Sequence, residues 1–182
     1  MRSDGGADPG GEARGPAIRD DDGGSRRARL TNVQLAFAVG AGVWAIDQLT
    51  KWWATVALAD GPIVLADGFL QFRLTYNTGA AFSMFSGGGP VLAVVAVGVV
   101  VMILWVVNDA SRRAEAVALG MVLGGAVGNL TDRIVRGDGF LDGAVVDFID
   151  FSFFATFNVA DMGITLGVGL LLLVAFLPKS AS

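Results

Sequence analysis

The hydropathy pattern contains four segments in which apolar residues continue for about the length of a membrane-spanning helix. The clearest is residues 91–107, which are 17 apolar or glycine residues without a charge. As an α-helix this segment would extend about 26 Å, close to the hydrocarbon thickness of a bilayer. The pattern predicts helices at about residues 33–57, 90–107, 114–130 and 159–177. We therefore expect a mainly α-helical integral membrane protein with four transmembrane helices.

Residues 1–29 differ from the rest of the chain because they are polar, rich in glycine and almost devoid of apolar side chains. They hold six arginines and six acidic residues. Such a segment buries too little apolar surface to offset the entropy lost on ordering. We expect a disordered cytoplasmic tail at residues 1–29 and a four-helix membrane domain at residues 30–182.

Two segments outside the expected helices favour β-structure. One runs from Gly68 to Tyr76 and the other from Gly143 to Phe151, and both are rich in β-branched and aromatic residues between turn-forming residues. They lie in the first and third loops of the bundle, which face the same side of the membrane. We expect them to form a small extracytoplasmic β-cradle on the membrane surface.

Basic residues favour one orientation of the bundle. Three arginines precede the first helix, Arg112 and Arg113 join the second helix to the third, and Lys179 follows the fourth helix. Loops rich in Lys and Arg usually remain in the cytoplasm. We expect both termini in the cytoplasm and the two β-containing loops on the outer side.

Composition limits the chemistry that is available. The chain has no cysteine and no histidine, which excludes disulfides, thiolate nucleophiles and imidazole bases. Its net charge is −4, without the clustered basic face that a nucleic acid would require, so no nucleic acid partner is expected. Chemistry must therefore use carboxylates, hydroxyls, amides, lysine or arginine.

Carboxylates near a bilayer are costly and are therefore candidates for function. Two aspartates that lie close together can share one proton, because like charges at short range do not both ionise. One can then act as a base toward water and the other as an acid toward a scissile peptide. The aspartates expected at helix ends or beside the bundle are Asp47, Asp132, Asp147 and Asp161.

Five short motifs follow one another along the expected helices and loops. They are Asp47-Gln-Leu-Thr-Lys51, Asn77-Thr-Gly-Ala-Ala-Phe82, Gly124-Gly-Ala-Val-Gly-Asn-Leu-Thr-Asp-Arg133, Val145-Val-Asp-Phe148 and Phe157-Asn-Val-Ala-Asp161. Each string alone is weak, but the ordered set and its placement on the helices are specific. From about residue 44 to residue 165 the sequence resembles the lipoprotein signal peptidases, also called type II signal peptidases.

The resemblance implies an aspartyl endopeptidase that removes the signal peptide from diacylglyceryl-modified bacterial prolipoproteins and cleaves before the lipidated cysteine. It implies a catalytic dyad of Asp147 and Asp161 at the outer face of the bacterial cytoplasmic (inner) membrane. It implies no metal and no organic cofactor. The expected partners are the diacylglyceryl-prolipoprotein substrates and membrane lipids, and the enzyme is expected to be a monomer.

Several other residues match family positions that bind substrate or support the dyad, namely Asn77, Asn129, Arg133 and Asn158. Helix capping is an alternative role for the asparagines, and for Asn158 the sequence supports capping nearly as well as it supports a role in the site. For Asp132 we favour a structural ion pair with Arg133 over a chemical role.

Asp47 and Lys51 lie four residues apart on one helical face, which favours a structural charge pair at a helix end. The non-enzymatic alternative is a small transporter that uses Asp47, Lys51 and Asp161 as relay charges. The second helix has no charge and no internal repeat is evident, so this alternative is disfavoured.

The acidic loop at residues 136–143 is longer than the family resemblance predicts, and it leaves a second alignment open. Asp142 or Asp150, otherwise expected in solvated loops, could take the place assigned to Asp147. The flanking Val-Val and Phe residues favour Asp147.

Overall fold

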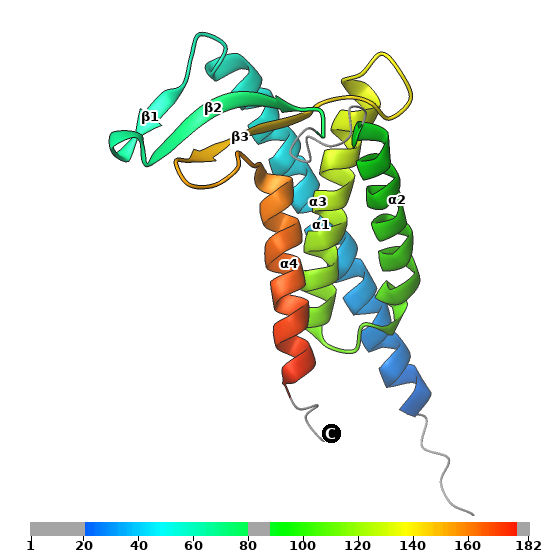
Figure 1. The fold of residues 1–182 in the computed structure, drawn as a ribbon. Coiled ribbons are helices and arrows are strands. Elements are labelled where there is room, and N and C mark those ends of the chain that lie inside the picture. The colour runs from blue at the N-terminus through cyan, green and yellow to red at the C-terminus, as the bar shows by residue number, and fades with distance from the viewer. Residues whose placement is uncertain (1–20, 80–87, 178–182) are drawn as a thin grey trace, which may run out of the picture.

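The computed structural model describes residues 21–79 and 88–177. The long helices are α1 (Asp21–Ala57), α2 (Gly88–Val106), α3 (Arg113–Val135) and α4 (Val159–Phe176). The strands are β1 (Ile63–Leu65), β2 (Leu70–Asn77) and β3 (Val145–Phe151), and short 3-10 turns occur at Ala66–Gly68 and Val107–Asp109. Figure 1 shows the four helices side by side, with the sheet projecting from one end of the bundle. The predicted combination of four membrane helices and a small sheet is confirmed.

Two helices extend beyond the predicted bounds: α1 at its start and α3 at its end, and both extensions carry polar residues. Helix α1 begins at Asp21, so residues 21–29, expected in the disordered tail, are helical. At 37 residues, α1 extends about 55 Å and exceeds the hydrocarbon thickness, so its polar start projects beyond the bilayer. Helix α3 continues to Val135 rather than ending near residue 130, because its last polar residues find buried partners. Residues 1–20 of the expected tail lie outside the described residues.

Helix α3 is the centre of the bundle and packs most extensively against α1 and α4. Glycines make this close packing possible. A Cβ at Gly120 or Gly124 would collide with backbone carbonyl oxygens of α1, and one at Gly125 would collide with the carbonyl oxygen of Ala160 in α4. Small residues at such crossings are typical of membrane helices that approach closely.

The sheet is antiparallel in the order β1–β2–β3. The predicted pairing of the two loop segments is confirmed, whereas the three-residue strand β1 was not predicted. In the register of β2 and β3, Thr75 lies opposite Asp147 and Asn77 lies opposite Val145. Trp53 near the end of α1 makes edge contacts with Phe72 and Phe148, which attach the sheet to the bundle.

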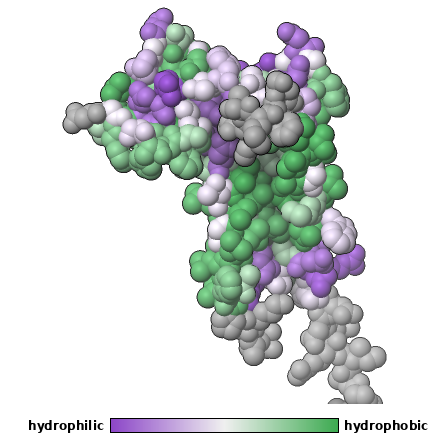
Figure 2. Space-filling view, in the orientation of Figure 1, coloured by the Kyte–Doolittle hydropathy of each residue, from purple (hydrophilic) through white to green (hydrophobic). Residues whose placement is uncertain are grey.

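The outer surface of the bundle is apolar. Figure 2 shows hydrophobic side chains covering the helices, with polar side chains gathered toward the two ends. Many large apolar residues on this surface are exposed, including Leu49, Trp52, Val94 and Leu172. Such a continuous exposed apolar surface is unsuited to water, and the four long apolar helices show a multi-pass membrane protein.

Candidate active site

The two aspartates of the predicted dyad come from different elements at the sheet end of the bundle. Asp147 lies in the middle of β3, and Asp161 lies in the first turn of α4. Both line a cavity of about 430 Å³ between α2, α3 and α4. The same cavity is lined by three more of the predicted site residues: Asn77, Asn129 and Arg133.

Asp147 is buried, with 2% of its surface exposed, and amide groups contact both of its carboxylate oxygens. Asn158 Nδ2 donates to Oδ1 at 2.6 Å, and Asn77 Nδ2 donates to Oδ2 at 3.0 Å. Burial raises the pKa of Asp147 to about 6, the nearby negative charge of Asp161 adds to the rise, and the two amide hydrogen bonds oppose it. Asp147 can therefore exchange a proton close to neutral pH.

Asp161 is partly exposed in the cavity and also receives two hydrogen bonds. Asn129 Nδ2 donates to its Oδ1 at 2.8 Å, and the backbone N–H of Asn158 donates to its Oδ2 at 3.3 Å. In return, the N–H of Asp161 donates to Asn158 Oδ1, which completes a capping box at the start of α4. Asn158 thus has the capping role offered as its alternative and also contacts both aspartates.

The structure distinguishes Asp147 from the two aspartates that the long loop left as alternatives. Asp142 is exposed and accepts a hydrogen bond from the N–H of Gly139 within the loop. Asp150 is buried, contrary to the expectation of a solvated position, because Gln71, Arg73 and Thr156 surround its carboxylate on the sheet. Among these three aspartates, Asp147 is the one that lines the cavity with Asp161.

Arg133 contributes a cation to the wall of the cavity. It is 4% exposed, and its Nη1 donates to the carbonyl oxygen of Gly143 at 3.2 Å. Its charge acts on that of Asp147 across the cavity. The bond to Gly143 holds the start of the β3 segment against the end of α3, which fixes the position of Asp147 relative to the helices.

A second polar cluster lies next to the aspartates, inside the bundle. Lys51 Nζ contacts Asp47 Oδ2 at 2.9 Å, Asp132 Oδ2 at 3.0 Å and Asn129 Oδ1 at 2.9 Å. Asp47, Lys51 and Asp132 are all fully buried. The expected pair of Asp47 and Lys51 is present, but Asp132 pairs with Lys51 and Arg136 rather than with its neighbour Arg133.

Sequence reasoning missed how this cluster reaches the site. Asp47 Oδ1 accepts the N–H of Ala160, the residue before Asp161, and Lys51 contacts Asn129, which in turn contacts Asp161. The spacing of Asp47 and Lys51 predicted their mutual contact alone. Contacts between residues 78 or more positions apart leave no local pattern in a single sequence.

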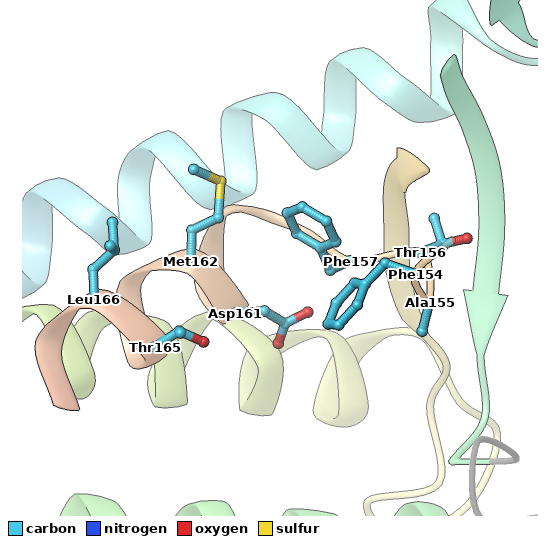
Figure 3. Close-up of a pocket in the computed structure, with 8 residues that line it drawn as sticks. All are labelled: Phe154, Ala155, Thr156, Phe157, Asp161, Met162, Thr165 and Leu166. Atoms are coloured by element: carbon cyan, nitrogen blue, oxygen red, sulfur yellow. The ribbon is translucent and has the colours of Figure 1, made fainter. Parts of the chain in front are cut away.

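A second cavity, of about 490 Å³, opens on the other flank of α4 and also includes Asp161. Figure 3 shows the carboxylate of Asp161 beside the rings of Phe154 and Phe157, with Met162 and Leu166 along the adjoining helix. Its walls are mainly apolar. Of the two phenylalanines, Phe157 belongs to the motif that contains Asp161, whereas Phe154 lies outside the motifs and could not be assigned to the site from the sequence.

The arrangement suits proton transfer by paired carboxylates. The two aspartates are tied to one another through Asn158, and neither accepts a hydrogen bond from a lysine or arginine among the described side chains. Within the same residues, no three His, Cys, Asp or Glu side chains gather in a way that could hold a metal ion. The structure therefore gives two carboxylates that line one cavity and are hydrogen-bonded by neutral amides.

Comparison with known proteins identifies the family. Residues 39–177 match the family described as signal peptidase (SPase) II. The chain is 41% identical over 144 residues to the lipoprotein signal peptidase of Rhodococcus jostii (strain RHA1), covering 79% of this chain and 73% of that one. It is 42% identical over 144 residues to that of Mycobacterium avium (strain 104), covering 79% of each.

A solved structure agrees with this assignment. A bacterial membrane enzyme determined by the in meso method superposes with a TM-score of 0.66 at 25% identity, covering 79% of this chain and 94% of that one. The sequence matches extend from α1 to α4 and include every aspartate discussed above. This chain belongs to the signal peptidase II family of membrane proteases.

Proposed function

We propose that this protein is an aspartyl endopeptidase that removes the signal peptide from diacylglyceryl-modified prolipoproteins, cleaving before the lipidated cysteine. The family relationship supports the prolipoprotein substrate, since the similar proteins of R. jostii and M. avium are lipoprotein signal peptidases. The observation that carries the aspartyl mechanism is the pairing of Asp147 and Asp161 in one cavity, with amide groups as their hydrogen-bond donors.

The different surroundings of the two aspartates suggest separate roles. Asp147 is the more deeply buried, and burial favours its protonated form. Asp161, as the carboxylate, takes a proton from a water molecule while the water oxygen attacks the scissile carbonyl carbon. Asp147 donates a hydrogen bond to the carbonyl oxygen. When the tetrahedral intermediate collapses, the C–N bond breaks, and the proton that Asp161 took from water passes to the leaving amine.

The two cavities support a substrate that is apolar on both sides of the scissile bond. The cavity between α2, α3 and α4 extends from Asn77 at the sheet to Met102 and Val168 farther down the helices. The second cavity begins at the same aspartate, Asp161, on the other flank of α4. A diacylated prolipoprotein has an apolar signal sequence on one side of the cleaved bond and acyl chains on the other, so both parts would find apolar walls.

We also propose that the dyad faces the outer side of the bacterial cytoplasmic membrane, with both termini in the cytoplasm. Arg112 and Arg113 lie at the start of α3, next to its connection with α2, at the end of the bundle opposite the sheet (Figure 1). Positive residues prefer the cytoplasmic side, which leaves the sheet and the aspartates outside. Membrane lipids as partners and a monomeric state remain predictions.

The transporter alternative gains no support from the arrangement of charges. Asp47 and Lys51 are fully buried and contact one another, so they do not line an open path. The described residues of α2 carry no charge in the span from Gly88 to Val106.

The deciding experiment is cleavage of a diacylated prolipoprotein by purified protein in detergent. Wild type is compared with Asp147→Asn and Asp161→Asn, and Asp142→Asn and Asp150→Asn serve as matched controls. We expect product ending before the lipidated cysteine from wild type and from both controls, and none from the two dyad variants. An active Asp147→Asn enzyme, or an inactive wild type, would refute the proposal.

A further inference from the structure

Lys51 is fully buried and makes one contact that reaches the aspartate pair as well as its own charge cluster. A lysine ammonium has three N–H donors, and all three are used here, on Asp47, Asp132 and Asn129. Two of these partners are carboxylates, and Arg136 binds the second oxygen of Asp132 at 2.9 Å. The two cations and two anions of this cluster balance in charge, and Asn129 supplies the acceptor for the third N–H of Lys51.

The contact with Asn129 determines which way its amide points. An ammonium group donates and never accepts, so Asn129 must present its Oδ1 to Lys51. The Nδ2 of the same amide is then directed at Asp161 Oδ1, at 2.8 Å. If the amide were reversed, its oxygen would lie against the Asp161 carboxylate, and two acceptors at hydrogen-bonding distance repel.

The other amide in the site is fixed by the same logic. The backbone N–H of Asp161 is a donor, so Asn158 presents Oδ1 to it and directs Nδ2 at Asp147 and at Asn129. Asn129 Oδ1 thus accepts from Lys51 and from Asn158 at once. The two amides form one oriented hydrogen-bond network. Among the described residues, Lys51 is the donor at the end of this network that lies inside the bundle.

We propose that Lys51 is a positioning residue for the aspartate pair: its ammonium orients the amide of Asn129 so that Asp161 receives an N–H rather than a carbonyl oxygen. This inference rests on the proposed function, because it assumes that Asp161 takes part in cleavage. It extends the role of Lys51 beyond a charge pair with Asp47.

The test is a double-mutant cycle between Lys51 and Asn129. Lys51→Met alone would leave two buried carboxylates with a single cation, so it is combined with Asp47→Asn, which restores the balance of charge. This charge-balanced variant, Asn129→Ala and their combination are purified in detergent. For each, kcat and KM for a diacylated prolipoprotein, the acid limb of the pH–rate profile and the unfolding temperature are measured.

We expect the charge-balanced variant and Asn129→Ala each to lower kcat by about 10- to 100-fold, as for loss of a hydrogen bond to a charged group. Combining them should lower kcat by no more than about threefold further, since both remove one interaction. In both, the acid limb should move to higher pH, because the ionised dyad loses a donor.

A matched control separates this effect from general loosening of the cluster. Gln48 contacts Asp47 Oδ2 at 3.1 Å and the carbonyl of Gly128, but it has no contact with Asn129 among the described hydrogen bonds. Gln48→Leu should lower the unfolding temperature while leaving kcat and the acid limb at wild-type values. Lys51→Gln combined with Asp47→Asn keeps the balance of charge and an N–H donor for Asn129, so its kcat should stay closer to wild type than that of the Met variant.

The role of Lys51 would be overturned if the kcat losses of the two variants multiplied when they are combined. It would also be overturned if the acid limb of the charge-balanced variant did not shift. A charge-balanced variant that folds and keeps wild-type kcat would overturn it as well, because Lys51 would then serve the fold alone. Each of these results leaves the proposed function intact if wild type still cleaves and Asp161→Asn does not. An inactive wild type would instead refute the proposed function itself.

Discussion

Two clusters of aspartates lie side by side in this protein and differ in what surrounds them. Asp47 and Asp132 are paired with Lys51 and Arg136 inside the bundle. Asp147 and Asp161 receive their hydrogen bonds from asparagine side chains and one backbone N–H. A nearby cation favours the ionised form of a carboxylate, whereas a neutral amide donor brings no charge. The charge of the partner therefore distinguishes the ion-paired cluster from the amide-bound pair that we propose to be reactive.

The sharpest test of this contrast exchanges each carboxylate for its neutral amide. Asp147→Asn and Asp161→Asn should lower kcat by about 1000-fold or more, because the loss of a general acid or base removes its whole contribution. Neither should lower the unfolding temperature. Asp132→Asn should do the reverse, with a clear loss of thermal stability in detergent. Equal loss of stability in all three variants would mean that the clusters do not differ as described.

The structural cluster should be the more sensitive to loss of its cation. Lys51→Met leaves Asp47 and Asp132 buried with one remaining charged partner, and breaking a buried pair costs about 3–5 kcal/mol. Thermal unfolding in detergent measures the loss, and the added substitution Asp47→Asn should recover much of it. Wild-type stability in Lys51→Met would show that the cluster is not held by charge.

The pH dependence of stability should distinguish the clusters as well. Burial raises the pKa of Asp147 to about 6, above the ordinary aspartate value of about 4, so the folded state binds more protons than the unfolded state between these values. The ionised group therefore destabilises the fold above pH 6, by up to about 3 kcal/mol, and this cost disappears as the pH falls toward 4.

Asp147→Asn should accordingly be more stable than wild type at pH 8, with the difference shrinking toward pH 4. Unfolding temperatures of the two proteins across this range provide the measurement. A difference that grows as the pH falls would show that Asp147 is stabilised in its charged form. The matched control is Asp150→Asn, which neutralises another buried carboxylate of β3, one that is ion-paired with Arg73.

The smallest effects are expected in the cavities that flank the reactive pair. Leu166→Trp would partly fill the cavity beside Phe154 and Phe157, and Ala96→Trp would partly fill the one between α2 and α4. Each should raise KM by about tenfold, at the low end of the range of about 1–3 kcal/mol for a poorly fitted apolar group.

Comparing a diacylated substrate with the same peptide lacking its acyl chains identifies the cavity that holds the lipid. The variant that changes KM for the diacylated substrate alone marks the acyl-chain cavity. If neither variant changes KM, the cavities do not hold substrate.

Much of the architecture could be predicted because it depends on local pattern. Uninterrupted apolar runs placed the helices, and β-branched and aromatic residues placed β2 and β3. The strand β1 has only three residues, too few for a periodic pattern. The length of α3 was underestimated because Asp132 and Arg133 read as polar residues beyond a membrane span, although both are buried by partners distant in the sequence.

The candidate site was predictable in its residues but not in its connections. The motifs supplied Asp147, Asp161 and the asparagines around them. That Lys51 reaches Asn129, or that Asp47 accepts the N–H of Ala160, depends on how α1 packs against α3 and α4. These contacts join positions 78 and 113 apart, so the chain must be folded before they exist.

The hydrogen bond from the N–H of Ala160 to Asp47 also bears on how the enzyme is made. It joins the first membrane helix to the last, while the reactive aspartates come from β3 and the start of α4. Of the four helices, α4 is the last to leave the ribosome. The proposed site therefore cannot form until α4 has joined the three earlier helices in the bilayer.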